Sequence, residues 1–266
     1  MKLPTLFIPH GGGPCFFMDP NGGPPDPMWQ PMQAYLADLI DSLPRRPRAI
    51  LLASGHWEEP QFTVHIGDGR PLLYDYYGFP EHTYRLRWDA PGALDVALQA
   101  KALLEEAGFP VAEESERGWD HGVFIPMKVA VSGADIPLAQ LSLRADLDPE
   151  AHIAIGRALA ALRDEGVLIV GSGMSFHNLR VRGAQAMAPS DEWDSALTDA
   201  VTEADPARRA RRVADWRALP NAVFAHPREE HLLPLMVALG AGGDDPARRD
   251  FSGHVLGWAV SGYRFG

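Results

Sequence analysis

The sequence of 266 residues contains ten histidines, and five of them stand where a predicted strand or helix begins or ends. Neutral imidazole is the commonest metal ligand in proteins, and its ordinary pKa near neutrality also suits it to proton transfer. The five are His10, His56, His121, His177 and His231. The single cysteine, Cys15, excludes a thiolate cluster, so a histidine-rich site here suits iron, zinc, copper or nickel.

Three of these histidines are placed by apolar runs that are typical of buried strands. His10 and His56 directly follow two such runs, and His177 lies a few residues beyond a third. Open α/β sheets bind ligands in the crevice at the carboxyl ends of their strands. Any one of these residues alone is more often a hydrogen-bonded structural histidine. Because three segments deliver imidazoles to the same rim, we predict a shared site there.

Predicted strands alternate with predicted helices along the whole chain, which indicates an α/β fold. We find no internal repeat and no linker, so residues 1–266 are expected to form a single domain with a central, mostly parallel or mixed sheet flanked by helices. Strands are expected at residues 3–9, 49–54, 62–66, 138–143 and 167–170, with a final strand or hairpin at 254–265. Helices are expected at residues 29–43, 93–107, 123–131, 149–165, 191–219 and 227–239.

The composition argues against two classes of binding partner, nucleic acids and membranes. The chain has 24 basic and 35 acidic side chains, and a net charge of −11 argues against nucleic-acid binding. No apolar run approaches the length that crosses a bilayer, and no secretory signal is expected, so we predict a soluble, cytoplasmic protein that does not bind membranes. One basic cluster is read as a solvated helix face: Arg208, Arg209, Arg211 and Arg212.

The glycine-rich stretch at residues 10–13 permits other chemistry. His-Gly-Gly-Gly is similar to the oxyanion-hole loop of lipases and esterases, but that mechanism needs a Gly-x-Ser-x-Gly nucleophile elbow. The serines at residues 171–175 lack this flanking pattern, and so do all the others. No Gly-Lys-Ser/Thr follows the glycines, which argues against a phosphate-binding loop.

Five motifs follow one another in the order PTLFIPHGGGP, ASGHW, DHGVFIPMKV, SGMSFHNL and HPREEHLLPLMVALGA. Together they resemble the class III extradiol ring-cleavage dioxygenases, from Pro4 to about Gly240. The branch that they resemble most is that of the DOPA 4,5-dioxygenase-like proteins, which is related to the large subunit of protocatechuate 4,5-dioxygenase. Each motif contains a histidine, so the resemblance is specific for the family and much less so for the substrate.

The resemblance assigns a role to each of the five histidines. It implies that His10, His56 and His231 are metal ligands. It implies that His177 is the acid/base residue, and a fourth ligand when zinc is bound. His121 is expected to lie beside the substrate and to hydrogen-bond one of its oxygens.

Three acidic residues near these histidines have competing interpretations. Glu229 and Glu230 directly precede His231, and successive helical residues point about 100° apart, so only one of the three can face a metal. The Glu-His-x-x-Pro-Leu register favours His231, and the two glutamates are expected in the first turn of a helix, where its dipole favours them. Asp120 is expected either to bind on the substrate side and orient His121 or to cap a helix.

The loop after His10 departs from the family pattern. The family commonly has His-Gly-Ser-Pro there, whereas this chain has a longer loop that ends at Cys15. Cys15 is expected to be a small buried hydrophobic residue. Aromatic residues gather in the segment 74–79, where they either form a wall of the substrate pocket or belong to the core or surface: Tyr74, Tyr76, Tyr77 and Phe79.

The resemblance implies a non-haem Fe(II) enzyme that opens a catechol-type, DOPA-like ring with O₂, with Zn(II) as an alternative metal in the isolated protein. Three protein ligands leave the positions on the iron that two catechol oxygens and O₂ require. His177 would take and return a catechol proton. Two other hypotheses remain: a zinc-dependent hydrolase that uses the same histidines, and a non-catalytic binding protein on this scaffold.

Overall fold

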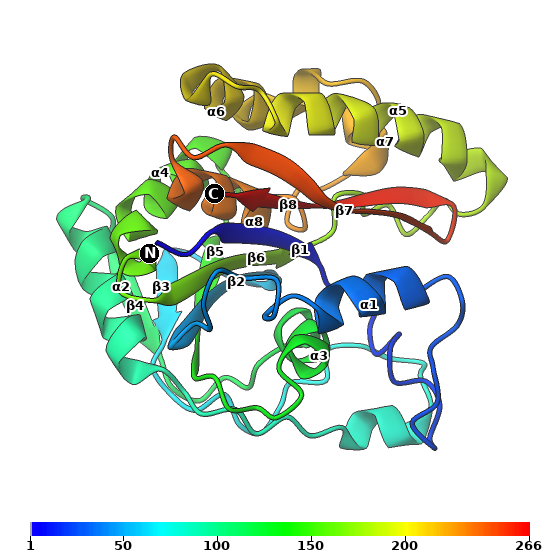
Figure 1. The fold of residues 1–266 in the computed structure, drawn as a ribbon, viewed down its shortest axis with the longest axis horizontal. Helices are drawn as coiled ribbons and strands as arrows, with labels where there is room; N and C mark the ends of the chain where they lie inside the picture. Colours follow the sequence, from blue (N-terminus) through cyan, green and yellow to red (C-terminus); the bar gives the residue numbers. More distant parts are fainter. Residues whose placement is uncertain (1) are drawn as a thin grey trace.

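A computed structural model describes residues 2–266 of the chain, and one mixed sheet runs through its centre (Figure 1). The strands are β1 (Thr5–Pro9), β2 (Ala49–Glu59), β3 (Phe62–His65), β4 (Val111–Glu114), β5 (Leu138–Arg144), β6 (Val167–Gly173), β7 (Ala247–Val255) and β8 (Trp258–Phe265). Their order across the sheet is β4-β3-β5-β2-β6-β1-β8-β7. The run from β5 to β1 is parallel, whereas β3 joins β5 and β8 joins β1 in antiparallel fashion. The expected single α/β domain with a mixed sheet is confirmed.

The helices connect these strands and cover the sheet. They are α1 (Gln30–Ala37), α2 (Leu94–Glu106), α3 (His121–Ala130), α4 (Pro149–Leu159), α5 (Ala184–Val201), α6 (Pro206–Ala214), α7 (Ala222–Ala225) and α8 (Leu233–Gly242), with short 3-10 turns at Glu81–Arg85, Ala160–Arg163 and Trp216–Ala218. In Figure 1, α5 and α6 lie above the sheet, and α1 and α3 lie below it. Within residues 2–266, none of the helices combines the length and the apolar character that crossing a membrane requires.

The strand β2 shows why its sequence is almost continuously apolar. Ile50 and Leu52 pack into the core cluster that includes α1 and α3. Leu51 and Ala53 pack into a second cluster with α2 and α4. Alternate side chains of a strand point to opposite faces, so a strand that is covered on both sides needs apolar residues at every position. This burial holds the carboxyl end of β2 rigidly beneath the site.

The expected single helix over residues 191–219 is wrong, because the chain forms α5 and α6 as separate helices. Asp205 ends the connection between them, and its carboxylate accepts a hydrogen bond from the backbone N–H of Arg208 at 2.7 Å. Pro206 then occupies the first turn, where its missing N–H costs nothing. A helix that ran through this point would lose a backbone hydrogen bond at Pro206.

The basic cluster on α6 is only partly a solvated face. Arg208, Arg211 and Arg212 are exposed as expected, but Arg209 is 1% exposed. Its guanidinium donates hydrogen bonds to the backbone oxygens of Gly243 and Asp245, at 2.7 and 2.9 Å. Arg209 therefore fastens α6 to the end of α8, which corrects the sequence interpretation.

Several element boundaries also differ from expectation. The short strand β4 was not predicted, and β2 continues to Glu59 instead of ending before His56. The pairing of β2 with β5 shifts register between Ala53 and Glu58, so His56 lies in an irregular part of the strand. Such an irregularity bends the strand and re-aims its side chains.

The contact between β6 and α8 leaves no room for a side chain at Gly171, which gives a first prediction. A Cβ at this position would lie 2.0 Å from the backbone oxygen of Pro234. We expect Gly171→Ala to destabilise the protein by about 1–3 kcal/mol or more, because two backbone segments must separate. Urea unfolding measures this change. Gly133→Ala is the matched control, since its Cβ would meet no atom closer than 3.6 Å. Equal stability of the two variants would contradict the prediction.

Candidate metal centre

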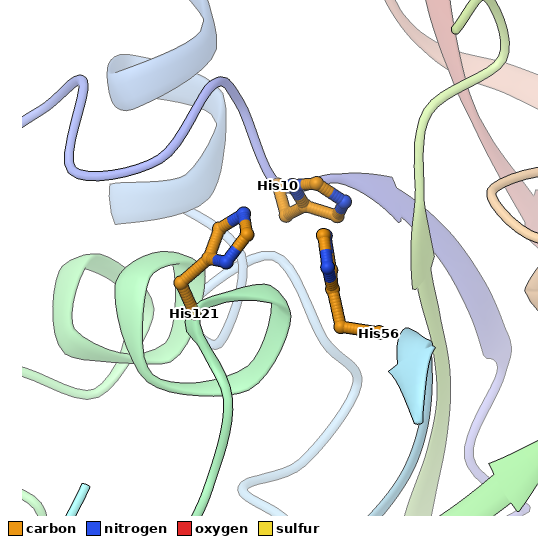
Figure 2. Close-up of side chains that lie close together, drawn as sticks. All are labelled: His10, His56 and His121. Carbon is orange, nitrogen blue, oxygen red and sulfur yellow. The ribbon is translucent and has the colours of Figure 1, made fainter. Parts of the chain in front are cut away.

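Three imidazoles from different elements face one another at the carboxyl end of the sheet (Figure 2). His10 directly follows β1, His56 lies in β2, and His121 is the first residue of α3. One ligand atom from each lies within 4.8 Å of the other two. The ring centroids of His56 and His121 are 3.9 Å apart, and that of His10 is 5.0 and 5.5 Å from them. The fold therefore builds a three-histidine site.

His231 reaches the same place from the turn that precedes α8. Its Nε2 atom lies 3.0 Å from Nε2 of His56, and its ring centroid lies 5.2 Å from that of His10. His231 is therefore a second candidate, beside His121, for the third ligand with His10 and His56, and it also belongs to a neighbouring group with His177 and Glu230.

His177 adds a fifth imidazole, which is stacked on His231. The two rings are 3.4 Å apart at an angle of 18°. Oε1 of Glu230 lies 2.9 Å from Nδ1 of His231 and 3.2 Å from Nδ1 of His177. The structure thus gathers all five histidines that the sequence singled out, and it adds a carboxylate that two of them share.

In all five of these rings, including that of His177, the Nδ1 atom faces a carbonyl or carboxylate oxygen that can only accept a hydrogen bond. His10 Nδ1 lies 2.9 Å from the carbonyl oxygen of Gly11, and His231 Nδ1 lies 2.9 Å from Oε1 of Glu230. Asp75 lies 2.7 Å from Nδ1 of His121 and 3.4 Å from Nδ1 of His56. Such contacts favour a proton on Nδ1, which leaves the Nε2 lone pair for a metal or a substrate.

The donor set can be tested against a bound metal. Nε2 of His10 is buried and has no hydrogen-bond partner among residues 2–266, which is costly without a ligand. Two nitrogens that bind one ion at right angles, each about 2.1 Å from it, lie about 3 Å apart. The separation of 3.0 Å between the Nε2 atoms of His56 and His231 matches this value. The residues present fit a metal ion.

Electrostatics keep the candidate ligands neutral. Burial, and then the neighbouring histidines, hold the pKa of His10, His56 and His231 well below the ordinary value. A neutral imidazole has the lone pair that a metal needs. Burial raises the pKa of Glu230, but the contacts with His177, the backbone and Arg228 together lower it more, so the pKa is lower than usual and the carboxyl is ionised. The site thus combines neutral ligands with anionic acceptors behind them.

Asp120, which was expected on the substrate side or as a helix cap, lies in a buried hydrogen-bond network. The Asp120 side chain is fully buried, and its oxygens accept hydrogen bonds from Ser54 at 2.7 Å and Gln140 at 2.6 Å. Arg117 pairs with it at 3.2 Å. Asp120 precedes α3 but makes no side-chain cap hydrogen bond. These contacts leave no surface for a ligand, and they join β2, β5 and α3 beneath the site.

Asp75, which the sequence did not point to, is the aspartate whose carboxylate contacts the His121 side chain. It lies between two tyrosines in an irregular loop after β3. In the sequence, this loop is not next to any of the strand ends from which the histidine site was predicted. Burial raises the pKa of Asp75, but hydrogen bonds from His121 lower it more, so the group is ionised. No pattern of spacing marks such a residue.

The two glutamates before His231 do not lie in the first turn of a helix. The helix α8 begins at Leu233, because Pro234 cannot donate a backbone hydrogen bond and fits only in the first turn. Glu229 instead pairs with Arg217 at 2.8 Å, and Glu230 faces His177 and His231. The expectation of an interaction with the helix dipole was therefore wrong for both.

The remaining residues that the sequence singled out lie at different depths. Cys15 is a small buried residue as expected, and burial raises the pKa of its thiol to about 12. Tyr76 is buried, with its ring 5.7 Å from that of His121. The ring of Phe79 packs against Tyr76 and close to Gly13, whereas Tyr77 is 91% exposed. Tyr76 and Phe79 therefore lie close to the site, whereas Tyr77 belongs to the surface.

Comparison with known proteins identifies relatives over nearly the full chain. The family model of the catalytic LigB subunit of aromatic ring-opening dioxygenase matches residues 4–262. The chain is 38% identical to the dioxygenase tasH of Hapsidospora irregularis, over 99% of this chain and 85% of the relative. It is 35% identical to a 4,5-DOPA dioxygenase extradiol of Beta vulgaris, over 91% of this chain and 87% of the relative. A solved structure of an uncharacterized Escherichia coli K12 protein has a TM-score of 0.77 and 28% identity, and each chain is covered completely.

Proposed function

The chain belongs to the LigB family of aromatic ring-opening dioxygenases, and it is a class III extradiol dioxygenase with a metal cofactor. From this premise we propose which metal it uses and which class of substrate it opens. We propose that the protein uses Fe(II), held by His10, His56 and His231, to open the ring of a DOPA-like catechol with O₂. The observation that carries the proposal is the convergence of Nε2 atoms: those of His56 and His231 lie 3.0 Å apart, and that of His10 is buried without a hydrogen-bond partner among residues 2–266. Relatives named 4,5-DOPA dioxygenase extradiol support the substrate class.

Ferrous iron, when bound, would supply a centre that holds catechol oxygens and O₂ together and passes electron density between them. The protein would contribute three neutral imidazoles, those of His10, His56 and His231. The buried strands β1 and β2 hold His10 and His56 rigidly, which reduces the cost of ordering the site.

His177 is suited to move the catechol proton. Its Nδ1 faces the Glu230 carboxylate at 3.2 Å, which favours the proton on Nδ1 and leaves Nε2 as the base. When Nε2 takes a proton, the imidazolium is stabilised by the ionised Glu230, in the manner of the carboxylate behind a catalytic histidine. His121 is suited to hydrogen-bond a substrate oxygen through Nε2, since Asp75 holds its other nitrogen.

The proposed function predicts one O₂ consumed for each catechol opened. Metal-free protein is loaded with Fe(II) under nitrogen and given a panel of catechols that includes L-DOPA. We expect yellow ring-opened products, O₂ uptake in equal amount, and ¹⁸O from ¹⁸O₂ at both cleaved carbons. The Zn(II)-loaded protein is the control and should be inactive, because zinc has no redox chemistry.

Two outcomes would contradict this prediction. Turnover under nitrogen at the aerobic rate would indicate hydrolysis by metal-bound water. Failure of both metal forms to open any catechol in the panel would favour a binding protein on this scaffold.

A further inference from the structure

We propose that Asp75 is a positioning residue that joins the metal ligand His56 to the substrate-side His121 through one carboxylate. Its Oδ1 atom accepts hydrogen bonds from Nδ1 of His121 at 2.7 Å and from the backbone N–H of His121 at 2.9 Å. Its Oδ2 atom lies 3.4 Å from Nδ1 of His56. The assignment of these two histidines rests on the proposed function, but the contacts themselves do not.

The two histidines that contact Asp75 come from elements that are far apart in the sequence. His56 comes from β2 and His121 from the start of α3, and their ring centroids are 3.9 Å apart. A carboxylate has two oxygens and can accept from both rings at once. The Asp75 carboxylate therefore lies against both rings, hydrogen-bonded to His121 and within 3.4 Å of His56.

The loop holds Asp75 from both sides. The hydroxyl of Tyr74 donates to the backbone oxygen of Leu86 at 2.5 Å, and the hydroxyl of Tyr76 donates to that of Thr83 at 2.6 Å. Both neighbours of Asp75 are thus hydrogen-bonded to the segment 83–86. The backbone at Asp75 is therefore already ordered, and little conformational entropy is lost when the carboxylate contacts the histidines. A residue that is held in this way can keep the side chains it contacts, here His56 and His121, in the orientation that metal and substrate binding require.

The same loop is fastened directly to the segment that carries His121. The backbone N–H of Leu73 donates to the backbone oxygen of Trp119 at 2.9 Å. The two segments approach so closely that a Cβ on Gly118 would lie 1.9 Å from the backbone oxygen of Pro71. These backbone contacts hold the loop of Asp75 next to the segment of His121, so the Asp75 side chain starts from a fixed position beside its partner.

Two substitutions separate the halves of this bridge. Asp75→Asn keeps an acceptor oxygen for His121 but presents an amide N–H₂ group to Nδ1 of His56, where two donors would face each other. Asp75→Ala removes both contacts. Since Asn is nearly isosteric with Asp, the first variant also remains informative if the second is poorly folded. Asp68→Asn is the matched control, because Asp68 lies in the same loop, is exposed, and pairs with Arg70 at 2.6 Å.

The first measurement is the affinity of the metal-free protein for Zn(II), by competition with a chelator. We expect Asp75→Asn and Asp75→Ala to weaken zinc binding roughly 10–100-fold, the range for carboxylates behind metal-bound histidines. Asp68→Asn should bind zinc like the unmodified protein. An unchanged affinity in Asp75→Asn would overturn the bridge to His56.

The second measurement is the ¹⁵N–¹H spectrum of the histidine side chains in the zinc-loaded protein, with the His121 signal assigned through His121→Gln. We expect a protected Nδ1–H signal from His121 in the unmodified protein and in Asp75→Asn, and its loss in Asp75→Ala. Persistence of this signal in Asp75→Ala would overturn the bridge to His121. Neither measurement involves turnover, so a protein that opens no catechol would disprove the proposed function and leave this test intact.

Discussion

Replacing His56 by alanine is expected to remove most of the bound metal and to abolish ring opening. His56 belongs to the ligand set whether His121 or His231 is the third ligand, and its Nε2 atom lies 3.0 Å from that of His231. Losing a ligand should cost more than the roughly 10–100-fold that follows from losing a residue behind a ligand. Elemental analysis after gel filtration measures the metal, and O₂ uptake measures the activity.

His254→Ala is the control for this prediction, because His254 is exposed and pairs with Asp191 at 2.7 Å, outside the site. It should retain both metal and activity. Two further variants identify the third ligand. With His231 as that ligand, His231→Ala loses the metal and His121→Ala keeps it while binding catechol more weakly. The reverse pattern would make His121 the ligand. Full metal content in His56→Ala would disprove the site.

Replacing His177 is expected to separate proton transfer from metal binding. His177→Phe keeps a ring in the stack with His231, whose centroid is 3.4 Å away, but has no nitrogen to carry a proton. We expect it to retain iron and to bind catechol under nitrogen, while turnover falls roughly 10²–10⁴-fold. Metal analysis, anaerobic titration with catechol and steady-state rates measure the three quantities.

His177→Ala completes the comparison. It removes the ring that supports His231, so a loss of iron in His177→Ala alone would report packing and would leave the proton-transfer role in place. Loss of iron in His177→Phe to the extent seen in His56→Ala would make His177 a principal ligand. Turnover in His177→Phe within a few-fold of the unmodified protein would contradict its role as the acid/base residue.

The parts of the site that could be predicted are those with a local signal. His10 follows an apolar run that ends in Pro9 and is itself followed by glycines, and His56 follows a run that ends in Gly55. These runs became the central strands β1 and β2, since only apolar residues can occupy strands that are buried on both faces. The position of such histidines is set by the nearest few residues, which a single sequence contains.

The parts that could not be predicted depend on which segments meet in the folded chain. Asp75 and Asp120 are both aspartates near aromatic residues, and only the packing of the loop against residues 118–121 decides which one faces His121. Helix boundaries failed for a related reason. The predicted helix began at residue 191, after Pro189, but α5 begins earlier and contains Pro189. Pro234, in contrast, lies in the first turn of α8 and sets where that helix starts. A proline limits where a helix can begin without fixing where it does.

The proximity of His56 and His231 has a consequence for the order of folding. These residues are 175 positions apart in the chain, and His10 lies on a strand whose two neighbours, β6 and β8, come much later in the sequence. Closing such distant contacts costs loop entropy that is recovered only when the sheet is assembled. The complete ligand set therefore exists only after nearly the whole chain has been synthesised and packed. An amino-terminal fragment that ends before β6 lacks His231 and most of the pairing of β1, so cofactor acquisition is a late event in the maturation of this enzyme.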